Sequence, residues 1–241
     1  MPLAMSAENA RRFWRALMAN AVALIDDADT LLTKGSAGRS RSLLILTQEE
    51  LARAQAVYDD ASPVWDQGGG TVTLTPPQGS KAHLSVSRDH REKISATDDY
   101  ARNLGPFWGD YSAWEDGATA EPARVPAEVD AQKQAGFYVA SAPGAGGRFS
   151  TPLDIDAEPI AAELLRVAQV AEMSLIRDQT RRQDRDDPDE FVSRLHWLLL
   201  PLAHPDEFAD FIAHMEGDGE ADEVQGNGGI SNEPPSSTKI P

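Results

Sequence analysis

Apolar side chains near the start of the chain recur at intervals of three and four residues, which is the spacing of one face of an α-helix. In the first such segment these positions are Phe13, Leu17, Ala21, Leu24, Ala28 and Leu31. Ser6 precedes the pattern and is suited to cap a helix N-terminus, and Gly35 follows it and is suited to end the helix.

A second helix is predicted over about residues 40–60, with Leu44, Leu51 and Tyr58 on one face. Few residues separate it from the first helix. The two should therefore pack antiparallel, as a helical hairpin over about residues 7–60.

The rest of the chain alternates helical patterns with segments rich in Gly and Pro. We expect a loop over 66–84 with a brief extended piece at TVTLT, a third helix over about 85–103, an irregular insert over 104–155, and C-terminal helices over 156–215. Within the insert, a short helix around 128–135 leads into GFYV, which is either a strand or an extended arm. Asp156 is expected to cap the next helix, and Pro201 to end the one after it. The prediction is an all-α, antiparallel helical bundle forming a single domain over 1–215.

Residues 216–241 differ in composition from everything before them. They are rich in Gly, Pro and Ser and contain six acids and one lysine. Because they have almost no apolar side chains to offset the entropy of ordering, we expect a disordered acidic tail.

Charge and composition narrow the classes of function. The net charge of −17 disfavours a nucleic-acid partner, since such binding needs clustered Lys and Arg. The absence of cysteine excludes disulfides, thiolate metal sites and a Cys nucleophile, and fits a reducing cytosol. No segment approaches the roughly 20 apolar residues of a membrane span, and Arg15 and Asn20 interrupt the early apolar run too soon for an export signal. We expect a cytoplasmic protein without membrane association.

Two adjacent acids, Glu49 and Glu50, lie inside the apolar pattern of the second helix. Glu49 lies four residues before Arg53, so we expect these two to form a helix ion pair. Glu50 lies beside the apolar stripe and should face the bundle, where a buried carboxylate needs a partner. His90 and Lys93 on the expected third helix are the candidates. The resulting cluster is either a structural polar tie or a ligand site. The remaining alternative is that Glu50 reaches solvent.

Sequence motifs for catalysis and cofactors were sought among the remaining polar residues. The five histidines, at positions 83, 90, 196, 204 and 214, have no metal-ligand spacing. No phosphate-binding loop, nucleophile elbow or dinucleotide-binding turn is found. We therefore predict no catalytic residue, metal or cofactor. Arg181, Arg182 and Arg185 could touch RNA, but aspartates interleave with them, which favours a solvated helix end.

An aromatic segment, FWGDYSAW, places four rings within eight residues: Phe107, Trp108, Tyr111 and Trp114. These rings either cover the open end of their own bundle or contact a partner or a second copy. If a homodimer forms, its contact is expected there or along the first two helices.

The order of several short motifs resembles the AbiV-type abortive infection proteins of bacteria. The matching residues are Asn20-Ala21, Asp27-Ala28, Leu31-Leu32, Gly35, Leu43 through Ala54, DHREK at 89–93, KQAGFYV at 133–139, and Pro152, Asp154 and Ile155. The resemblance covers about residues 9–180. It implies a role in defence against phage and a helical fold similar to HEPN domains. HEPN ribonucleases carry an Arg, four to six residues and a His, and that motif is not found here.

Three functions follow from these observations. The first is a non-enzymatic defence protein that binds a protein partner of phage or host origin. The second is a HEPN-like ribonuclease or toxin with an unorthodox site at Glu50, His90 and Lys93. The third is a helical interaction domain without a defence role.

Overall fold

The computed structural model describes residues 3–65, 69–74, 126–141, 149–185, 187–210 and 212. The chain divides into two compact units, Met1–His204 and Pro205–Pro241. In the second unit residues 205–210 are helical. The described residues of the first unit are helical apart from two small sheets and short connections, which confirms the predicted all-α fold class.

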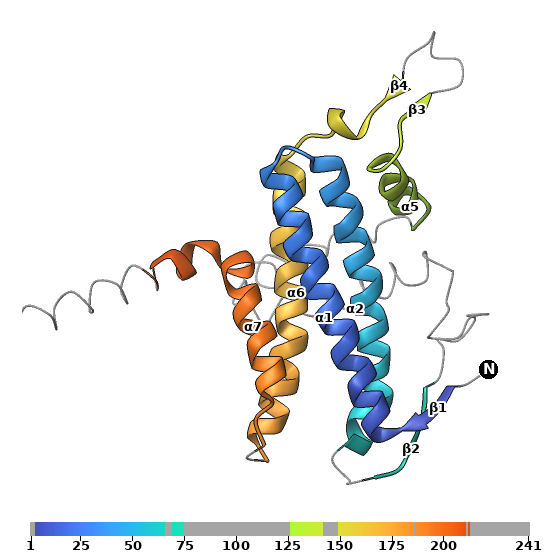
Figure 1. The fold of residues 1–241 in the computed structure, drawn as a ribbon, viewed down its shortest axis with the longest axis vertical. Coiled ribbons are helices and arrows are strands. Elements are labelled where there is room, and N and C mark those ends of the chain that lie inside the picture. Colours follow the sequence, from blue (N-terminus) through green and yellow to red (C-terminus); the bar gives the residue numbers. More distant parts are fainter. Residues whose placement is uncertain are drawn as a thin grey trace, which may run out of the picture. The chain divides into compact units, whose positions relative to one another are not determined.

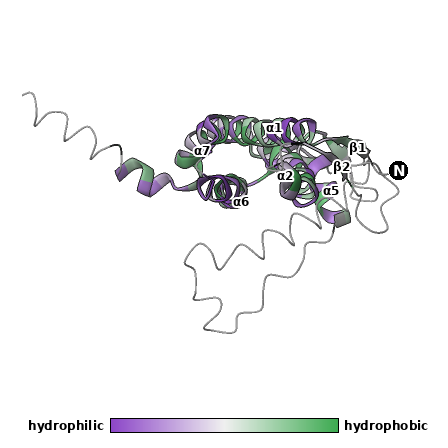
Figure 2. Cartoon of the chain, turned by 90° about the horizontal axis from the view of Figure 1, so that it is seen from below, coloured by the Kyte–Doolittle hydropathy of each residue, from purple (hydrophilic) through white to green (hydrophobic). Residues whose placement is uncertain are grey.

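The longest helices in the described part of the first unit (Figure 1) are α1 (Ala7–Thr33), α2 (Ala37–Trp65), α6 (Glu158–Gln183) and α7 (Glu190–Ala203). Helix α1 packs along α2, and α6 packs along α7. Helix α6 also contacts both α1 and α2, so the two helix pairs share one core. Hydrophobic and hydrophilic residues alternate around these helices, as an amphipathic bundle requires (Figure 2).

Local signals set both ends of α1. The hydroxyl of Ser6 accepts a hydrogen bond from the backbone N–H of Asn9, at 3.2 Å. At the other end Gly35 has a positive φ of 77°, and its N–H donates to the carbonyl of Leu32. The N–H of Ser36 donates to the carbonyl of Leu31, which completes a Schellman motif and turns the chain into α2.

Two prolines lie inside helices. Helix α2 continues past the expected end near residue 60 to Trp65 and contains Pro63. The prediction that Pro201 ends its helix is wrong, because α7 continues to Ala203. Both prolines lie close to a helix C-terminus, so each removes one backbone hydrogen bond without interrupting a long ladder.

The core lies between the four helices. Its largest fully buried apolar side chains include Trp14, Met18, Ile25, Leu44, Leu175 and Leu199. Trp14, Tyr58 and Trp65 form a ring cluster with centroids 5.4–5.8 Å apart. Tyr58 and Trp65 lie near the end of α2, so this cluster holds it against the beginning of α1.

Two antiparallel sheets flank the helices. Strand β1 (Leu3–Ser6) pairs with β2 (Thr71–Leu74), and Val72 and Leu74 of β2 are buried. The sequence indicated an extended piece at β2 but not its partner β1. Farther along the chain come α5 (Pro126–Ala135), the strand pair β3 (Ala140–Ser141) and β4 (Phe149–Ser150), and a short 3₁₀ helix, η2 (Pro152–Asp154).

Several expectations fall on residues outside the described ranges. They are the third helix over about 85–103, the aromatic residues 107–114, and the acidic tail over 216–241. Asp156 does not cap α6 as expected. The N-cap position is Ala157, and Asp156 accepts instead from the N–H of Glu158. Among the described helices, none combines the length and the apolar character that a membrane crossing needs.

We expect Gly35→Ala to lower the free energy of unfolding by about 1 kcal/mol, because a side chain disfavours the left-handed conformation. An added Cβ would meet no atom within 4 Å, so strain and not collision sets this cost. Gly35→Asn should lower the free energy of unfolding less than Gly35→Ala does, since asparagine tolerates the left-handed conformation better. Urea unfolding of the three proteins measures the difference, and equal midpoints for Gly35→Ala and the parent would contradict it.

Candidate functional site

The buried acid of α2 is Glu49. Glu49 is 3% exposed, and its Oε1 atom lies 2.8 Å from Nζ of Lys133 on α5. Lys133 is itself only 4% exposed. Asp130 lies one turn before Lys133 and is 3.3 Å from the same Nζ atom. The sequence predicted that Glu50 faces the bundle, whereas Glu49 is the more deeply buried of the two acids.

Glu50 occupies a more exposed position. Its side chain is 18% exposed, and its Oε1 atom lies 2.7 Å from Arg53. The expected ion pair between Glu49 and Arg53 stays a prediction. The predicted partners His90 and Lys93 lie outside the described residues, and their contact with Glu50 stays a prediction.

Helix α5 is fixed to the beginning of α2 by main-chain contacts as well as by this ion pair. The hydroxyl of Ser42 donates to the carbonyl of Lys133 at 2.7 Å, and Arg41 donates to the carbonyl of Gln132 at 3.2 Å. Gly136, directly after α5, lies so close to α2 that a Cβ would overlap the Ser42 hydroxyl and the carbonyl of Gly38.

The chain returns to α2 at η2. A Cβ on Gly38 would overlap the backbone of Pro152, so this second contact also depends on a glycine. Thr151 and Asp154 form a capping box, in which the Thr151 N–H donates to Asp154 Oδ2 at 2.8 Å and the Leu153 N–H donates to Thr151 Oγ1 at 3.1 Å. The segment between Gly136 and Pro152 is therefore held against α2 at both ends.

We call the described residues 137–141 and 149–153 of this segment the apolar arm. Its large apolar side chains are exposed: Phe137 by 41%, Tyr138 by 64%, Val139 by 66%, Phe149 by 67% and Leu153 by 71%. Phe149 pairs with Ser141 across the two strands.

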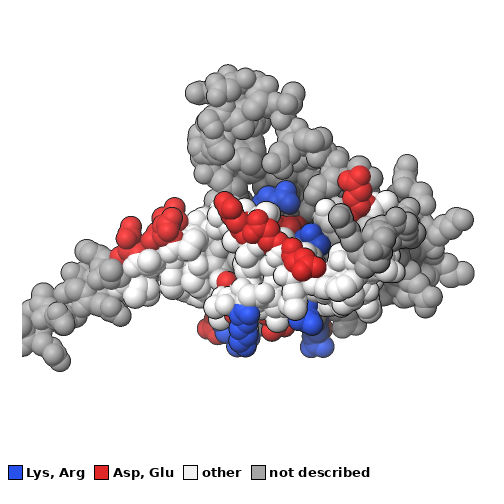
Figure 3. Space-filling view, turned by 90° about the horizontal axis from the view of Figure 1, so that it is seen from above, with Lys and Arg blue, Asp and Glu red and all other residues white. Residues whose placement is uncertain are grey.

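Acidic side chains adjoin the arm. Asp154, Asp156 and Glu158 follow it directly and are exposed. Carboxylates are spread over the described surface on the face that Figure 3 shows, with a few basic side chains among them. The arm is thus an apolar surface with an acidic border.

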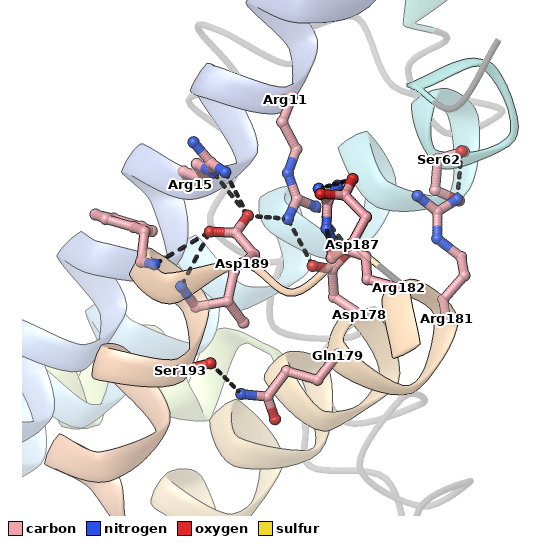
Figure 4. Close-up of polar contacts among 12 residues, drawn as sticks. Arg11, Arg15, Ser62, Asp178, Gln179, Arg181, Arg182, Asp187, Asp189 and Ser193 are labelled. Atoms are coloured by element: carbon pink, nitrogen blue, oxygen red, sulfur yellow. Dashed lines mark hydrogen bonds and ion pairs between the residues drawn. The ribbon is translucent and has the colours of Figure 1, made fainter. Parts of the chain in front are cut away.

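An arginine–aspartate cluster occupies the opposite end of the α1–α2 hairpin (Figure 4). Arg11 donates to both carboxylate oxygens of Asp178 at 2.6 Å and to Asp189 at 2.5 Å. Arg15 also binds Asp189, and Arg182 binds Asp187. These contacts connect α1 with the end of α6 and with the N-cap of α7, where Asp189 accepts from two backbone N–H groups.

The charges in this cluster stabilise one another. Burial alone would lower the pKa of the Arg11 guanidinium, but hydrogen bonds and the charges of Asp178 and Asp189 raise it. Burial would raise the pKa of Asp189, and its bonds to Arg11 and Arg15 lower it instead. Arg11 also lies over the rings of Trp14 and Trp65, at 4.6 and 4.9 Å. Arg181 and Arg182 are structural, which corrects the expectation of a solvated helix end for these two: Arg181 binds the carbonyl of Ser62, and Arg182 is largely buried. Arg185 is exposed, as that expectation requires.

Another buried carboxylate is Glu172 of α6, which contacts α7 and the residue at the C-cap of α7. Its Oε1 is 2.9 Å from Nε2 of His196, and its Oε2 is 2.7 Å from Nε2 of His204. Burial would raise the pKa of Glu172, but the two histidine hydrogen bonds outweigh that effect and lower it. Within the described residues, no group of three or more His, Asp or Glu side chains is arranged to hold a metal ion.

The described helices form an all-α bundle, and an all-α fold fits the HEPN class of domains. A family model described as AbiV matches residues 9–171, well over half of the chain, and the chain belongs to that family. The resemblance seen in the sequence is thereby confirmed. Membership in a family of abortive infection proteins suggests a role in defence against phage. Searches of curated proteins and of solved structures found no match.

The matched range contains both halves of the Glu49–Lys133 contact. The sequence singled out the Glu49 segment and KQAGFYV at 133–139 as separate motifs. In the structure the first Lys of that motif neutralises the buried acid, and its last three residues begin the apolar arm.

We expect Lys133→Met to destabilise the fold by about 3–5 kcal/mol, because it removes the Lys133 cation from the buried carboxylate of Glu49. Glu49→Gln should cost less, because Asp130 still lies 3.3 Å from Nζ of Lys133. The double variant Glu49→Leu/Lys133→Met should recover much of that loss. Glu50→Gln is the matched control on the same helix and should cost about 1 kcal/mol or less, since its ion pair is partly exposed. Thermal and urea unfolding measure all four. A double variant no more stable than the single ones would contradict the buried pair.

Acidification should remove the contribution of Glu172 to stability. The folded-state pKa of Glu172 is lowered, so its contribution is complete above the ordinary value of 4.5 and is lost as the pH falls through the folded-state pKa. Near neutral pH, we expect the free energy of unfolding of the parent protein to be about 1–3 kcal/mol higher than that of Glu172→Gln. This difference should shrink in acid, which urea unfolding across a pH series measures. A difference that does not change with pH would show that the charge of Glu172 is unimportant.

Proposed function

We propose that this protein acts in defence against phage by binding a protein partner through the apolar arm. The observation that carries the proposal is the exposure of five large apolar side chains on a segment that is fixed to the bundle at both ends. Contiguous exposed apolar surface is uncommon on proteins without a partner, and aromatic residues are enriched where partners bind.

The fixed position of the arm favours binding. Phe137 and Tyr138 follow directly after Gly136, and Leu153 lies inside the capping box that docks on Gly38. A surface that is already ordered loses little conformational entropy when a partner binds, so more of the contact energy appears as affinity.

The surroundings of the arm indicate the chemistry of the partner. The exposed acids after η2 would repel an acidic surface and attract a basic one. We therefore expect a phage or host protein that offers an apolar groove with Lys or Arg at its border. The acidic net charge of the whole chain points the same way and disfavours RNA as the target.

A ribonuclease is the second candidate, and it rests on the HEPN class alone. In the described residues, the buried carboxylates Glu49 and Glu172 are both held in structural contacts between helices. Incubating the purified protein with total cellular RNA tests this candidate. RNA cleavage that is lost in Glu50→Gln would replace partner binding as the proposed activity.

The arm is tested with Tyr138→Ser/Phe149→Ser. Both side chains are mostly exposed, so the melting temperature should change little, whereas each lost aromatic contact should weaken binding by about 1–2 kcal/mol. Phage plating on cells that express the variant should rise to the level of cells without the gene. In parallel, affinity capture from infected and uninfected cells should recover a partner with the parent protein and lose it with the variant.

Trp197→Ser/Leu198→Ser is the matched control. Both residues are 57% exposed on α7, outside the arm, so the control removes similar apolar surface elsewhere on the same unit. This control variant should still protect cells against phage and should still recover the partner in affinity capture. Full protection by the arm variant, or equal loss in both variants, would reject the arm as the binding surface.

A further inference from the structure

A hollow of about 460 Å³ lies where α1 begins and α2 ends. Its wall includes the guanidinium-bearing residues Arg11, Arg15 and Arg182, together with Trp65 and the backbone at Gly69–Gly70. Its volume lies within the roughly 300–1,000 Å³ of small-molecule sites. This hollow is at the end of the α1–α2 hairpin opposite to the arm.

The charges at the wall favour an anion. Among the described lining residues the one carboxylate is Glu8, which pairs with Arg12 at 2.7 Å. The aspartates that hold the three arginines, Asp178, Asp187 and Asp189, are not among those lining residues. Cationic groups therefore face the hollow, while their counter-charges lie to the side.

The arginines retain hydrogen-bond donors. Arg15 donates to the carboxylate of Asp189 through Nε and one terminal nitrogen. Arg182 donates through Nε to the backbone carbonyl of Asp187 and through one terminal nitrogen to its carboxylate. In the part of the chain that the structure describes, the other terminal nitrogen of each has no acceptor. Nε of Arg11 and Nε1 of Trp65 are buried, and they too have no hydrogen-bond acceptor among the described residues. Buried N–H groups without acceptors are rare and call for an explanation.

We propose that this hollow binds a small phosphate monoester. A phosphate offers several oxygens to guanidinium groups, whose planar arrangement of donors suits it. The aspartates fix Arg11, Arg15 and Arg182 in place, so little side-chain entropy is lost on binding. The volume exceeds what a bare phosphate needs, and Trp65 with the neighbouring glycine backbone provides an uncharged wall for the organic group.

The positive end of the helix dipole of α1 adds to this field. Two of its first N–H groups already have acceptors, however. The N–H of Ala7 already donates to the carbonyl of Gly70, and the N–H of Asn9 donates to Ser6. The guanidinium groups therefore carry the recognition, and variants of them test it directly.

The test is calorimetric titration of the full chain with phenyl phosphate, with phenol as the neutral counterpart and sodium chloride at matched ionic strength. We expect saturable binding of phenyl phosphate, accompanied by a rise in melting temperature, and no binding of phenol. Arg15→Gln and Arg182→Gln should each weaken binding by at least about tenfold, since each removes hydrogen bonds to a charged group.

Two further variants separate binding from folding. Arg177→Gln removes an arginine of α6 that pairs with Asp59 and is not among the residues lining the hollow, so it should bind as the parent does. Glu8→Gln removes the lining carboxylate from an exposed position and should bind phenyl phosphate more tightly without loss of stability. The proposal is overturned if phenyl phosphate does not bind saturably or phenol binds equally. It is also overturned if Glu8→Gln fails to bind more tightly, or if Arg15→Gln and Arg182→Gln bind as Arg177→Gln does.

Discussion

The position of the apolar arm depends on the neutralisation of one buried carboxylate. Glu49 lies on a helix that contacts α1, α6 and α5, so its charge cannot reach water and requires a cation inside the protein. Lys133 supplies that cation from 84 positions away in the sequence. The same contact places the end of α5 against α2, and the exposed aromatic residues begin four positions later. A requirement for charge balance in the core thus sets where a surface feature lies.

The beginning of the chain could be predicted because its signals are local. The N-cap at Ser6, the apolar spacing of α1 and the turn at Gly35 each depend on residues within one or two helical turns. Because the connection after Gly35 is short, α2 must pack antiparallel to α1. The identity of the buried acid could not be predicted in this way. Helix α2 buries Ser40, Ser42, Thr47 and Gln48 as well as its apolar stripe, so more than one of its faces is covered. Because two faces of α2 are buried, the position of a residue around the helix axis does not show whether Glu49 or Glu50 is the buried acid.

The polar contacts between segments far apart in the sequence could not be predicted either, because residue spacing shows only which side chains are neighbours on one helix. Arg11 and Asp178 are 167 residues apart, and Glu172 meets two histidines of another helix. The spacing of charges along α6 favoured solvation at its end, because sequence shows neighbours on one helix and not those across a packed interface. Each of these carboxylates is buried where two helices meet. They therefore fix how the helix pairs fit together, while apolar burial supplies most of the stability.

The glycines at positions 38 and 136 bring main chain against main chain where the arm meets α2. Backbone atoms are the same whatever side chains the arm carries, so the junction places few demands on residues such as Tyr138 and Phe149. Mutations at the exposed positions can accordingly change the surface of the arm while leaving its location and the bundle intact. For the proposed role in defence, this separation means that recognition of a changed phage protein could arise through single substitutions that do not destabilise the fold.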